Sequence, residues 1–191
     1  MFSLLLRGFV LGFAVAASPG PIFFLCVRRT LLQGRLAGLF SGFGVATADA
    51  FYAAIATFGV AALAAAFVAG RRPLAVVGGG ILVGFGLRIL FDRRQAAEAP
   101  AALTGRGLAW AYVSTLGLTI TNPATIISFA GPALVVAGVL LGSAAWWCIL
   151  VLAASLLRAR LTPGVVRGIS TFSGLAIAVL GILAVISAFS G

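Results

Sequence analysis

The sequence predicts an all-helical integral membrane protein with six transmembrane helices, forming a single membrane domain over residues 1–191. Three observations lead to this fold class: 62% of the residues are hydrophobic, only 8% are charged, and the apolar residues fall in long runs. A soluble domain carries about 25% charged residues. This chain has too few polar side chains to cover a water-exposed surface, so its apolar side chains are expected to face lipid.

Six apolar runs are long enough to cross a bilayer, which takes about 20 helical residues. They cover residues 3–27, 37–68, 73–91, 107–131, 133–157 and 164–189. The polar stretch 92–106 between the third and fourth runs is the only loop of real length expected. Only Gly131-Pro132 separates the fourth run from the fifth.

The arginines predict the topology. If the chain crosses six times, the loops after spans 1, 3 and 5 share one side of the membrane. That side holds ten of the thirteen basic residues, namely Arg28, Arg29, Arg35, Arg88, Arg93, Arg94, Arg106, Arg158, Arg160 and Arg167. Positive charge accumulates on cytoplasmic loops. We therefore expect a bacterial inner (plasma) membrane protein with both termini outside.

The order of spans suggests a duplicated unit. The first three-helix half would cover residues 1–91 and the second 107–191, joined by a cytoplasmic loop over 92–106. Because each half holds an odd number of spans, the halves would be inverted, a plan common among transporters. Gly20-Pro21 and Asn122-Pro123 occupy similar places in the first span of each half. The sequence thus predicts a 3+3 inverted repeat in which helices 1 and 4 are broken.

Ser18, Pro19, Gly20 and Pro21 lie inside the first span. Two prolines remove two backbone donors and disfavour helix in the residues before them. The backbone groups freed by such a break must be met by protein, water or substrate. Transporters bind substrate at broken helices, so these residues are candidate substrate contacts; the alternative is a simple packing kink.

Thr121, Asn122 and Pro123 repeat this pattern in the fourth span and are also candidate substrate contacts. Asn supplies both a donor and an acceptor. Thr121 shares one helical face with Ser114, Thr125 and Ser128. This stripe either lines a polar cavity or bonds back to its own or a neighbouring helix.

Asp49 is the only acidic residue within any predicted span. A charged Asp at mid-helix costs roughly 2.5–3.5 kcal/mol on insertion scales, so such residues usually face the bundle interior and are functional. Asp49 and Tyr52 share a face with Gly38, Gly42 and Val45, which suits close packing. We expect Asp49 and Tyr52 in the substrate site, with Asp49 as counter-charge or proton-coupling site; the alternative is a structural hydrogen bond.

Other function classes find little support. The chain has no His and two isolated cysteines, Cys26 and Cys148, so no metal site or cofactor is expected. No paired carboxylates, phosphate loop or Ser-His arrangement indicates an enzyme, and no basic face with aromatics indicates nucleic-acid binding.

Glycines and tryptophans are expected in structural roles. The glycines at 80 and 84, 138 and 142, and 174 and 181 are interpreted as helix-contact surfaces, which are also compatible with a homodimer. Trp110, Trp146 and Trp147 are expected as interfacial anchors, with Trp146 or Trp147 as an alternative cavity wall.

Five stretches make the chain resemble the LysE/RhtB family of amino-acid exporters. They are Ser18-Pro19-Gly20-Pro21, the glycine pattern 34–44 followed by Asp49, the glycine motif 79–88, Thr121-Asn122-Pro123, and the span from Gly174 to Gly181. Ala124 stands where the family usually carries Lys, and Val83 stands near its usual aromatic. The resemblance implies export of amino acids from the cytoplasm, driven by protons. The alternatives are an ion or metal transporter of related architecture and a lipid-handling membrane protein.

Overall fold

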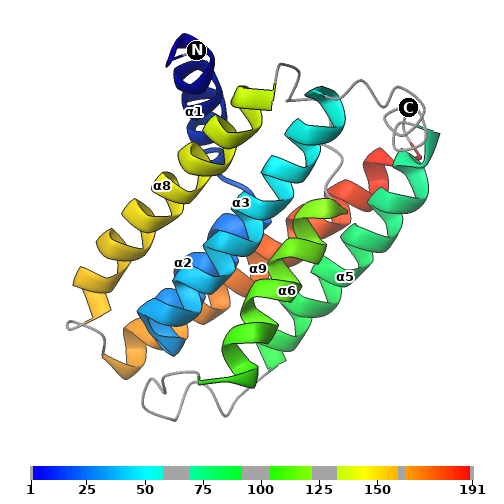
Figure 1. The fold of residues 1–191 in the computed structure, drawn as a ribbon. Helices are drawn as coiled ribbons and strands as arrows, with labels where there is room; N and C mark the ends of the chain where they lie inside the picture. The colour runs from blue at the N-terminus through cyan, green and yellow to red at the C-terminus, as the bar shows by residue number, and fades with distance from the viewer. Residues whose placement is uncertain (1, 58–68, 92–103, 122–132, 159–161, 190–191) are drawn as a thin grey trace.

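The computed structural model describes residues 2–57, 69–91, 104–121, 133–158 and 162–189. These residues form seven helices and no strand (Figure 1). The helices are α1 (Phe2–Ala16), α2 (Pro21–Gln33), α3 (Arg35–Thr57), α5 (Arg71–Phe91), α6 (Arg106–Ile120), α8 (Ala133–Arg158) and α9 (Pro163–Ser187). The predicted all-helical class is therefore confirmed for the described part of the chain.

Four helices, α3, α5, α8 and α9, are each long and apolar enough to cross a membrane. The bent pair of α1 and α2 makes a fifth crossing if it is counted as one span. The fourth predicted span begins with α6, and its remainder, residues 122–131, lies outside the described residues. The chain is thus a multi-pass membrane protein, while the count of six spans and the division into two halves stay predictions.

The first predicted span is broken where the prolines indicate. The axes of α1 and α2 differ by 81°. Gly20, the last residue of the break, is fully extended, with φ −144° and ψ −177°, and Pro21 occupies the first turn of α2. Proline is tolerated there because the first amides of a helix have no intrahelical acceptor.

The expected end of the first span at residue 27 is wrong. Helix α2 continues to Gln33, and the turn into α3 is Gly34 alone, whose φ of 99° favours glycine. Arg28 and Arg29, expected in a loop, are therefore helical and buried. Their stretch of sequence is polar, but contacts with neighbouring helices support the helix.

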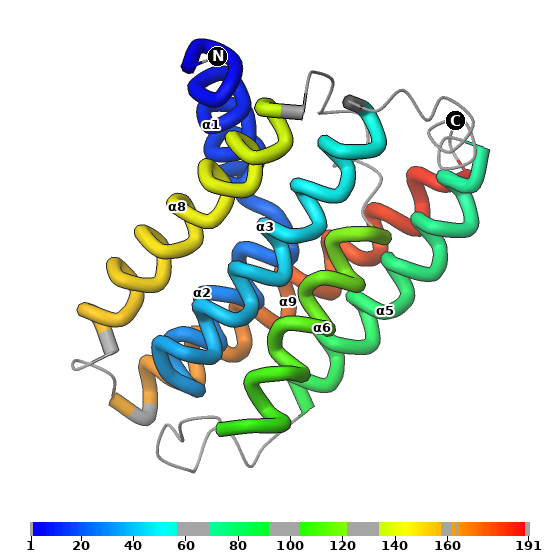
Figure 2. The backbone as a smooth tube through the Cα atoms, viewed as in Figure 1, coloured from blue at the N-terminus to red at the C-terminus, as the bar shows by residue number. Residues whose placement is uncertain are grey.

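The helices form one bundle with α3 near its centre (Figure 2). Helix α1 packs on α8, α5 packs on α9, and α3 lies against both α6 and α8. The start of α1 and the end of α9 lie at the same end of the bundle (Figure 2). This arrangement agrees with an even number of crossings.

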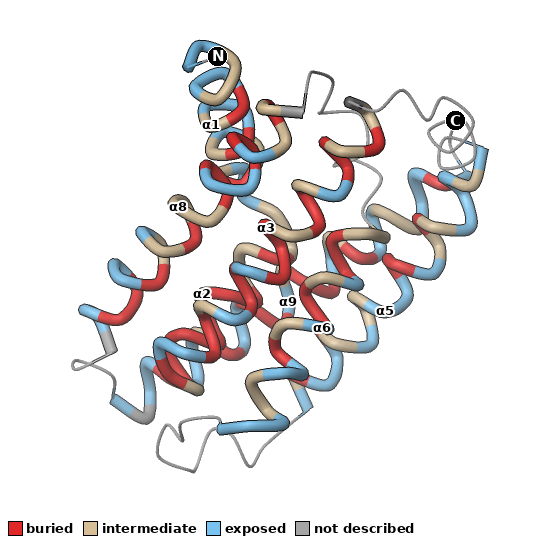
Figure 3. Tube along the Cα trace, viewed as in Figure 1, coloured by how far each residue is buried: buried red, intermediate tan, exposed pale blue. Residues whose placement is uncertain are grey.

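The outer surface of the bundle is apolar. Figure 3 shows buried positions on the sides of the helices that face one another and exposed positions on the outside. The exposed side chains include Leu156 at 73% and Phe172 at 64% exposure. Water would disfavour such a surface, whereas lipid suits it.

Glycine allows the closest helix contacts. A Cβ added to Gly142 would lie 2.0 Å from the carbonyl oxygen of Phe9, and one added to Gly12 would lie 2.3 Å from that of Val139. The backbones of α1 and α8 therefore touch. On α9, Gly181 packs in the same way against Gly79 of α5.

The contact surfaces expected at Gly138, Gly142, Gly174 and Gly181 are confirmed, whereas Gly80 and Gly84 contact no other described helix of this chain. Both of these glycines are exposed, and no atom of the described residues lies within 4 Å of a Cβ added at either. Helix α5 instead turns Gly78, Gly79 and Gly86 inward. The spacing of the glycines on α5 indicates a contact motif, but it does not show which of these glycines face a neighbouring helix.

We expect Gly142→Ala to destabilise the fold, because its methyl group would overlap the backbone of α1. Overpacking of this kind costs about 1–3 kcal/mol. The matched control, Gly80→Ala, adds the same methyl group where there is space. Thermal unfolding in detergent should show a lower midpoint for Gly142→Ala only; equal midpoints for the two variants would contradict the close α1–α8 contact.

Candidate functional site

The break between α1 and α2 opens into a cavity of about 400 Å³ that also contains Asp49. Side chains from α1, α2, α3, α6, α8 and α9 surround it. They are Val15, Ala16, Ser18, Pro19, Gly20, Pro21, Ile22, Phe23, Val45, Asp49, Thr119, Trp147 and Leu180. Five of the predicted site residues, Ser18 to Pro21 and Asp49, thus come together although 28 positions separate Pro21 from Asp49.

The break presents a helix N-terminus to this cavity. Helix α2 has no side-chain cap at Gly20, and its first backbone hydrogen bond of the ordinary helical kind runs from Phe24 to the Gly20 carbonyl, at 3.4 Å. The amides of Ile22 and Phe23 precede that bond and lack intrahelical acceptors. Together with the helix dipole, they make this wall of the cavity favourable for an anionic group.

Asp49 forms the acidic wall of the cavity. It is only 2% exposed, and the Ser143 hydroxyl donates to its Oδ2 at 2.7 Å. Ser143 lies on α8 next to Gly142, and Gly42 of α3 packs directly on the Trp147 side chain of α8. The small residues therefore bring α3 and α8 close enough for this hydrogen bond.

Trp147 and Thr119 complete the polar part of the lining. Trp147 is 3% exposed, and its indole Nε1 has no hydrogen-bond partner among the described residues. A buried indole N–H normally finds an acceptor, but the Nε1 atom is itself buried, so we assign it no ligand contact. The Thr119 hydroxyl already donates to the Thr115 carbonyl, at 2.7 Å.

Two predicted site residues lie elsewhere. The Tyr52 hydroxyl donates to the Ile120 carbonyl at the end of α6, and Tyr52 does not line the cavity. The Thr121 hydroxyl donates to the carbonyls of Gly117 and Leu118 in its own helix. Thr121 lines a neighbouring cavity of about 130 Å³ between α2, α5, α6 and α9, which shares Pro21, Ile22 and Leu180 with the Asp49 cavity. Asn122 and Pro123 lie outside the described residues.

The hydroxyl groups of the predicted stripe at Ser114, Thr121, Thr125 and Ser128 do not all have the same kind of hydrogen-bond partner. Ser114, expected with Thr121 on a polar face, accepts a hydrogen bond from Arg29 at 2.8 Å, while Thr121 bonds back to its own helix. Thr125 and Ser128 lie outside the described residues. The alternative of hydroxyls satisfied within the bundle is therefore the one observed for the two residues that can be placed.

Sequence reasoning missed Ser143 and Thr119, and it named Trp147 only as an alternative. One signal was available for Ser143, since a buried carboxylate needs a donor. Several hydroxyls in the second half offered such a donor, and only the packing of α3 on α8 selects Ser143. Among the described residues, no three His, Cys, Asp or Glu side chains gather into a metal-binding group.

We expect Ser143→Ala to destabilise the protein, because it removes the donor to a buried carboxylate. A buried group left without its partner costs about 1–3 kcal/mol. The control is Ser170→Ala, since the buried Ser170 hydroxyl has no hydrogen-bond partner among the described residues. Thermal unfolding of the Asp49→Asn/Ser143→Ala double variant should show clear non-additivity; simple addition would refute the hydrogen bond.

The comparisons with known proteins agree with these features. Residues 13–188 match the model of a family described as LysE type translocator. The chain is 33% identical over 115 residues to the "Uncharacterized membrane protein YahN" of Escherichia coli (strain K12), a match that covers 59% of this chain. The chain spans about half (51%) of the length of that relative. No solved structure matches. Since the family model covers most of the chain, this protein belongs to the LysE type translocator family.

Proposed function

We propose that this protein is a secondary active transporter that exports amino acids, or close derivatives, from the cytoplasm. Members of its family are membrane translocators. The observation that carries the proposal is the cavity in which the broken first helix meets Asp49. Transporters of several folds bind substrate where a discontinuous helix lines a cavity inside the bundle.

The cavity offers one group that attracts an ammonium group and another that attracts a carboxylate, as a zwitterion requires. The Asp49 carboxylate attracts an ammonium group, and the unoccupied amides at the start of α2 attract a carboxylate. Its volume of about 400 Å³ equals about thirteen water molecules at roughly 30 Å³ each. An amino acid fits this space, whereas a whole phospholipid does not.

The walls favour a substrate whose side chain is uncharged. Among the described residues that line the cavity, Asp49 is the only charged one, and Val45, Trp147 and Leu180 present apolar surface. A basic amino acid would bring a second positive charge with no counter-charge there, at the high cost of an unpaired buried ion. We therefore propose neutral amino acids as the substrate class.

Asp49 also provides the simplest route to proton coupling. It is the only acidic residue in the described part of the chain. A proton and a substrate ammonium group would compete for one carboxylate, so that proton entry from outside releases the substrate and proton loss allows the next one to bind. The Ser143 hydroxyl holds Asp49 in place throughout.

Helix contacts support the predicted inverted repeat and its use in alternating access. In a 3+3 repeat, the contact of span 1 with span 5 has its counterpart in the contact of span 4 with span 2. Helix α1 packs on α8, and α6 packs on α3, which is the expected pair. The break at Pro19–Pro21 would then act as the hinge when the halves rock. The predicted break at Asn122-Pro123 lies outside the described residues.

The orientation is proposed from the arginines. The end of the bundle opposite the termini carries Arg28, Arg29, Arg35, Arg88 and Arg106, so we place that end in the cytoplasm. Alkaline phosphatase fused after Gly191 should be active in cells, and green fluorescent protein at the same place should be dark. The reverse pattern would place the termini in the cytoplasm.

Export itself is tested in everted membrane vesicles with radiolabelled neutral, basic and acidic amino acids. We expect wild-type vesicles to accumulate a neutral amino acid and to lose this activity when an uncoupler is added. Asp49→Asn should abolish the accumulation, because the variant cannot bind and release a proton. The control Glu98→Gln removes a carboxylate from the predicted loop 92–106 and should transport normally.

The contrary results would separate the alternatives. Normal gradient-driven export by Asp49→Asn would remove Asp49 from the mechanism. Absence of amino-acid movement, with folded protein present, would favour the ion or metal transporter or the lipid-handling protein. Binding of a divalent metal ion would favour the ion or metal transporter. We also propose that the protein forms a homodimer. The mass of the protein–detergent particle should then equal two chains plus detergent.

A further inference from the structure

The cavity lined by Thr121 adjoins the Asp49 cavity at the start of α2, and we call it the side cavity. Pro21 and Ile22 of α2 and Leu180 of α9 line both cavities. On α6, Leu118 lines the side cavity, and the next residue, Thr119, lines the Asp49 cavity. The two cavities therefore share a wall at the first turn of α2.

The described lining of the side cavity is apolar. Thr121 is the one polar side chain among the described residues that line it, and its hydroxyl donates to the carbonyls of Gly117 and Leu118 in its own helix. The other described lining residues are glycines, a proline, and alanine, leucine or isoleucine side chains. A polar group is costly to bury without hydrogen-bond partners, so these walls favour an apolar occupant.

The first turn of α2 places a bound amino acid beside both cavities. Its amides at Ile22 and Phe23, which lack intrahelical acceptors, are the groups that would attract the substrate carboxylate. Ile22 itself lines both cavities. The α-carbon of an amino acid carries the carboxylate, the ammonium group and the side chain. With its carboxylate at these amides and its ammonium group toward Asp49, the substrate would have its side chain beside the wall that the cavities share.

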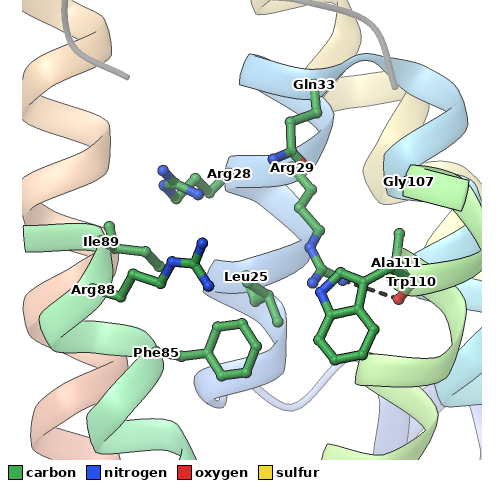
Figure 4. Close-up of a pocket in the computed structure, with 10 residues that line it drawn as sticks. All are labelled: Leu25, Arg28, Arg29, Gln33, Phe85, Arg88, Ile89, Gly107, Trp110 and Ala111. Atoms are coloured by element: carbon green, nitrogen blue, oxygen red, sulfur yellow. Dashed lines mark hydrogen bonds between the residues drawn. The ribbon is translucent and has the colours of Figure 1, made fainter. Parts of the chain in front are cut away.

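A third cavity, between α2, α5 and α6, does not border the Asp49 cavity in this way (Figure 4). It is lined by Arg28, Arg29 and Arg88, among other residues. None of its described lining residues lines the Asp49 cavity or the side cavity. Of the two smaller cavities, the side cavity is therefore the one that a substrate side chain would reach from Asp49.

We propose that the side cavity is the specificity pocket of the transporter and holds an aliphatic side chain of the substrate. This inference rests on the proposed function and narrows its substrate class from neutral amino acids to aliphatic ones such as leucine. The volume of the side cavity is about 130 Å³. That volume corresponds to about four water molecules at roughly 30 Å³ each, which suits a side chain of about four carbon atoms.

Export by the full chain, measured as initial uptake into everted membrane vesicles, tests the proposal with radiolabelled alanine, leucine, phenylalanine and asparagine. Asparagine is similar in size to leucine but polar, so it tests the apolar character of the walls. We expect wild-type vesicles to take up leucine with a higher kcat/KM than alanine or asparagine.

Ala184→Leu should fill the side cavity, because Ala184 lines it and does not line the Asp49 cavity. The ratio of kcat/KM for leucine over alanine should fall about tenfold or more, since one methylene group in a hydrophobic pocket already changes discrimination by about 10–200-fold. The matched control Ala153→Leu makes the same change at an exposed position of α8 and should keep the wild-type ratio.

Leu82→Ala tests the same pocket in the opposite direction and serves if Ala184→Leu does not fold. Leu82 also lines the side cavity and not the Asp49 cavity, so its truncation enlarges the pocket. The ratio of kcat/KM for phenylalanine over leucine should rise about tenfold. The control Leu152→Ala removes an exposed leucine of α8 and should leave this ratio unchanged.

The proposed function is judged by the absolute rate of the wild type, whereas the specificity pocket is judged by ratios between substrates. Absence of amino-acid export by folded wild-type protein would overturn both. An unchanged ratio in folded Ala184→Leu, or in folded Leu82→Ala if the first variant does not fold, would overturn the pocket and leave the exporter standing. Wild-type export of asparagine with a kcat/KM equal to that of leucine would also overturn the pocket.

Discussion

Backbone amides and carbonyls inside a membrane need hydrogen-bond partners, and the break at Pro19-Gly20-Pro21 is where this chain meets that constraint. The prolines cannot donate, and the extended Gly20 leaves the first amides of α2 without intrahelical acceptors. In hydrocarbon such groups would be costly. The bundle places them instead at a cavity that also contains Asp49. The break in the helix thus forms one half of the site that we propose for a zwitterion.

Glycine packing makes the other half possible. Gly42 lets α3 approach Trp147, and Gly138 and Gly142 let α8 approach α1. The closeness of α3 and α8 brings Ser143 within 2.7 Å of Asp49. The carboxylate therefore has a fixed position, and no arginine among the described residues lines its cavity. Three of the arginines line a different pocket, between α2, α5 and α6.

The sequence predicts much of this arrangement because its strongest signals are local. Apolar length predicts the four helices that are long enough to cross a membrane, two prolines predict the break, and a lone mid-helix acid indicates an inward-facing site. What it misses depends on rotation and packing of helices. Tyr52 shares a helical face with Asp49, yet its hydroxyl reaches the Ile120 carbonyl instead of the cavity. Ser143 and the exposed face of Gly80 and Gly84 could be found only once the neighbours of α8 and α5 were known.

The central claim is that substrate passes through the cavity at the helix break, and Gly20→Leu tests it most directly. The backbone of Gly20 is extended, and no atom of the described part of the chain lies within 4 Å of an added Cβ, so leucine should fit the fold and fill the cavity. Gly84→Leu is the control, since Gly84 has the same free space on the outside of α5. Initial export rates should collapse for Gly20→Leu and stay near wild type for Gly84→Leu. Wild-type rates in folded Gly20→Leu would contradict the account.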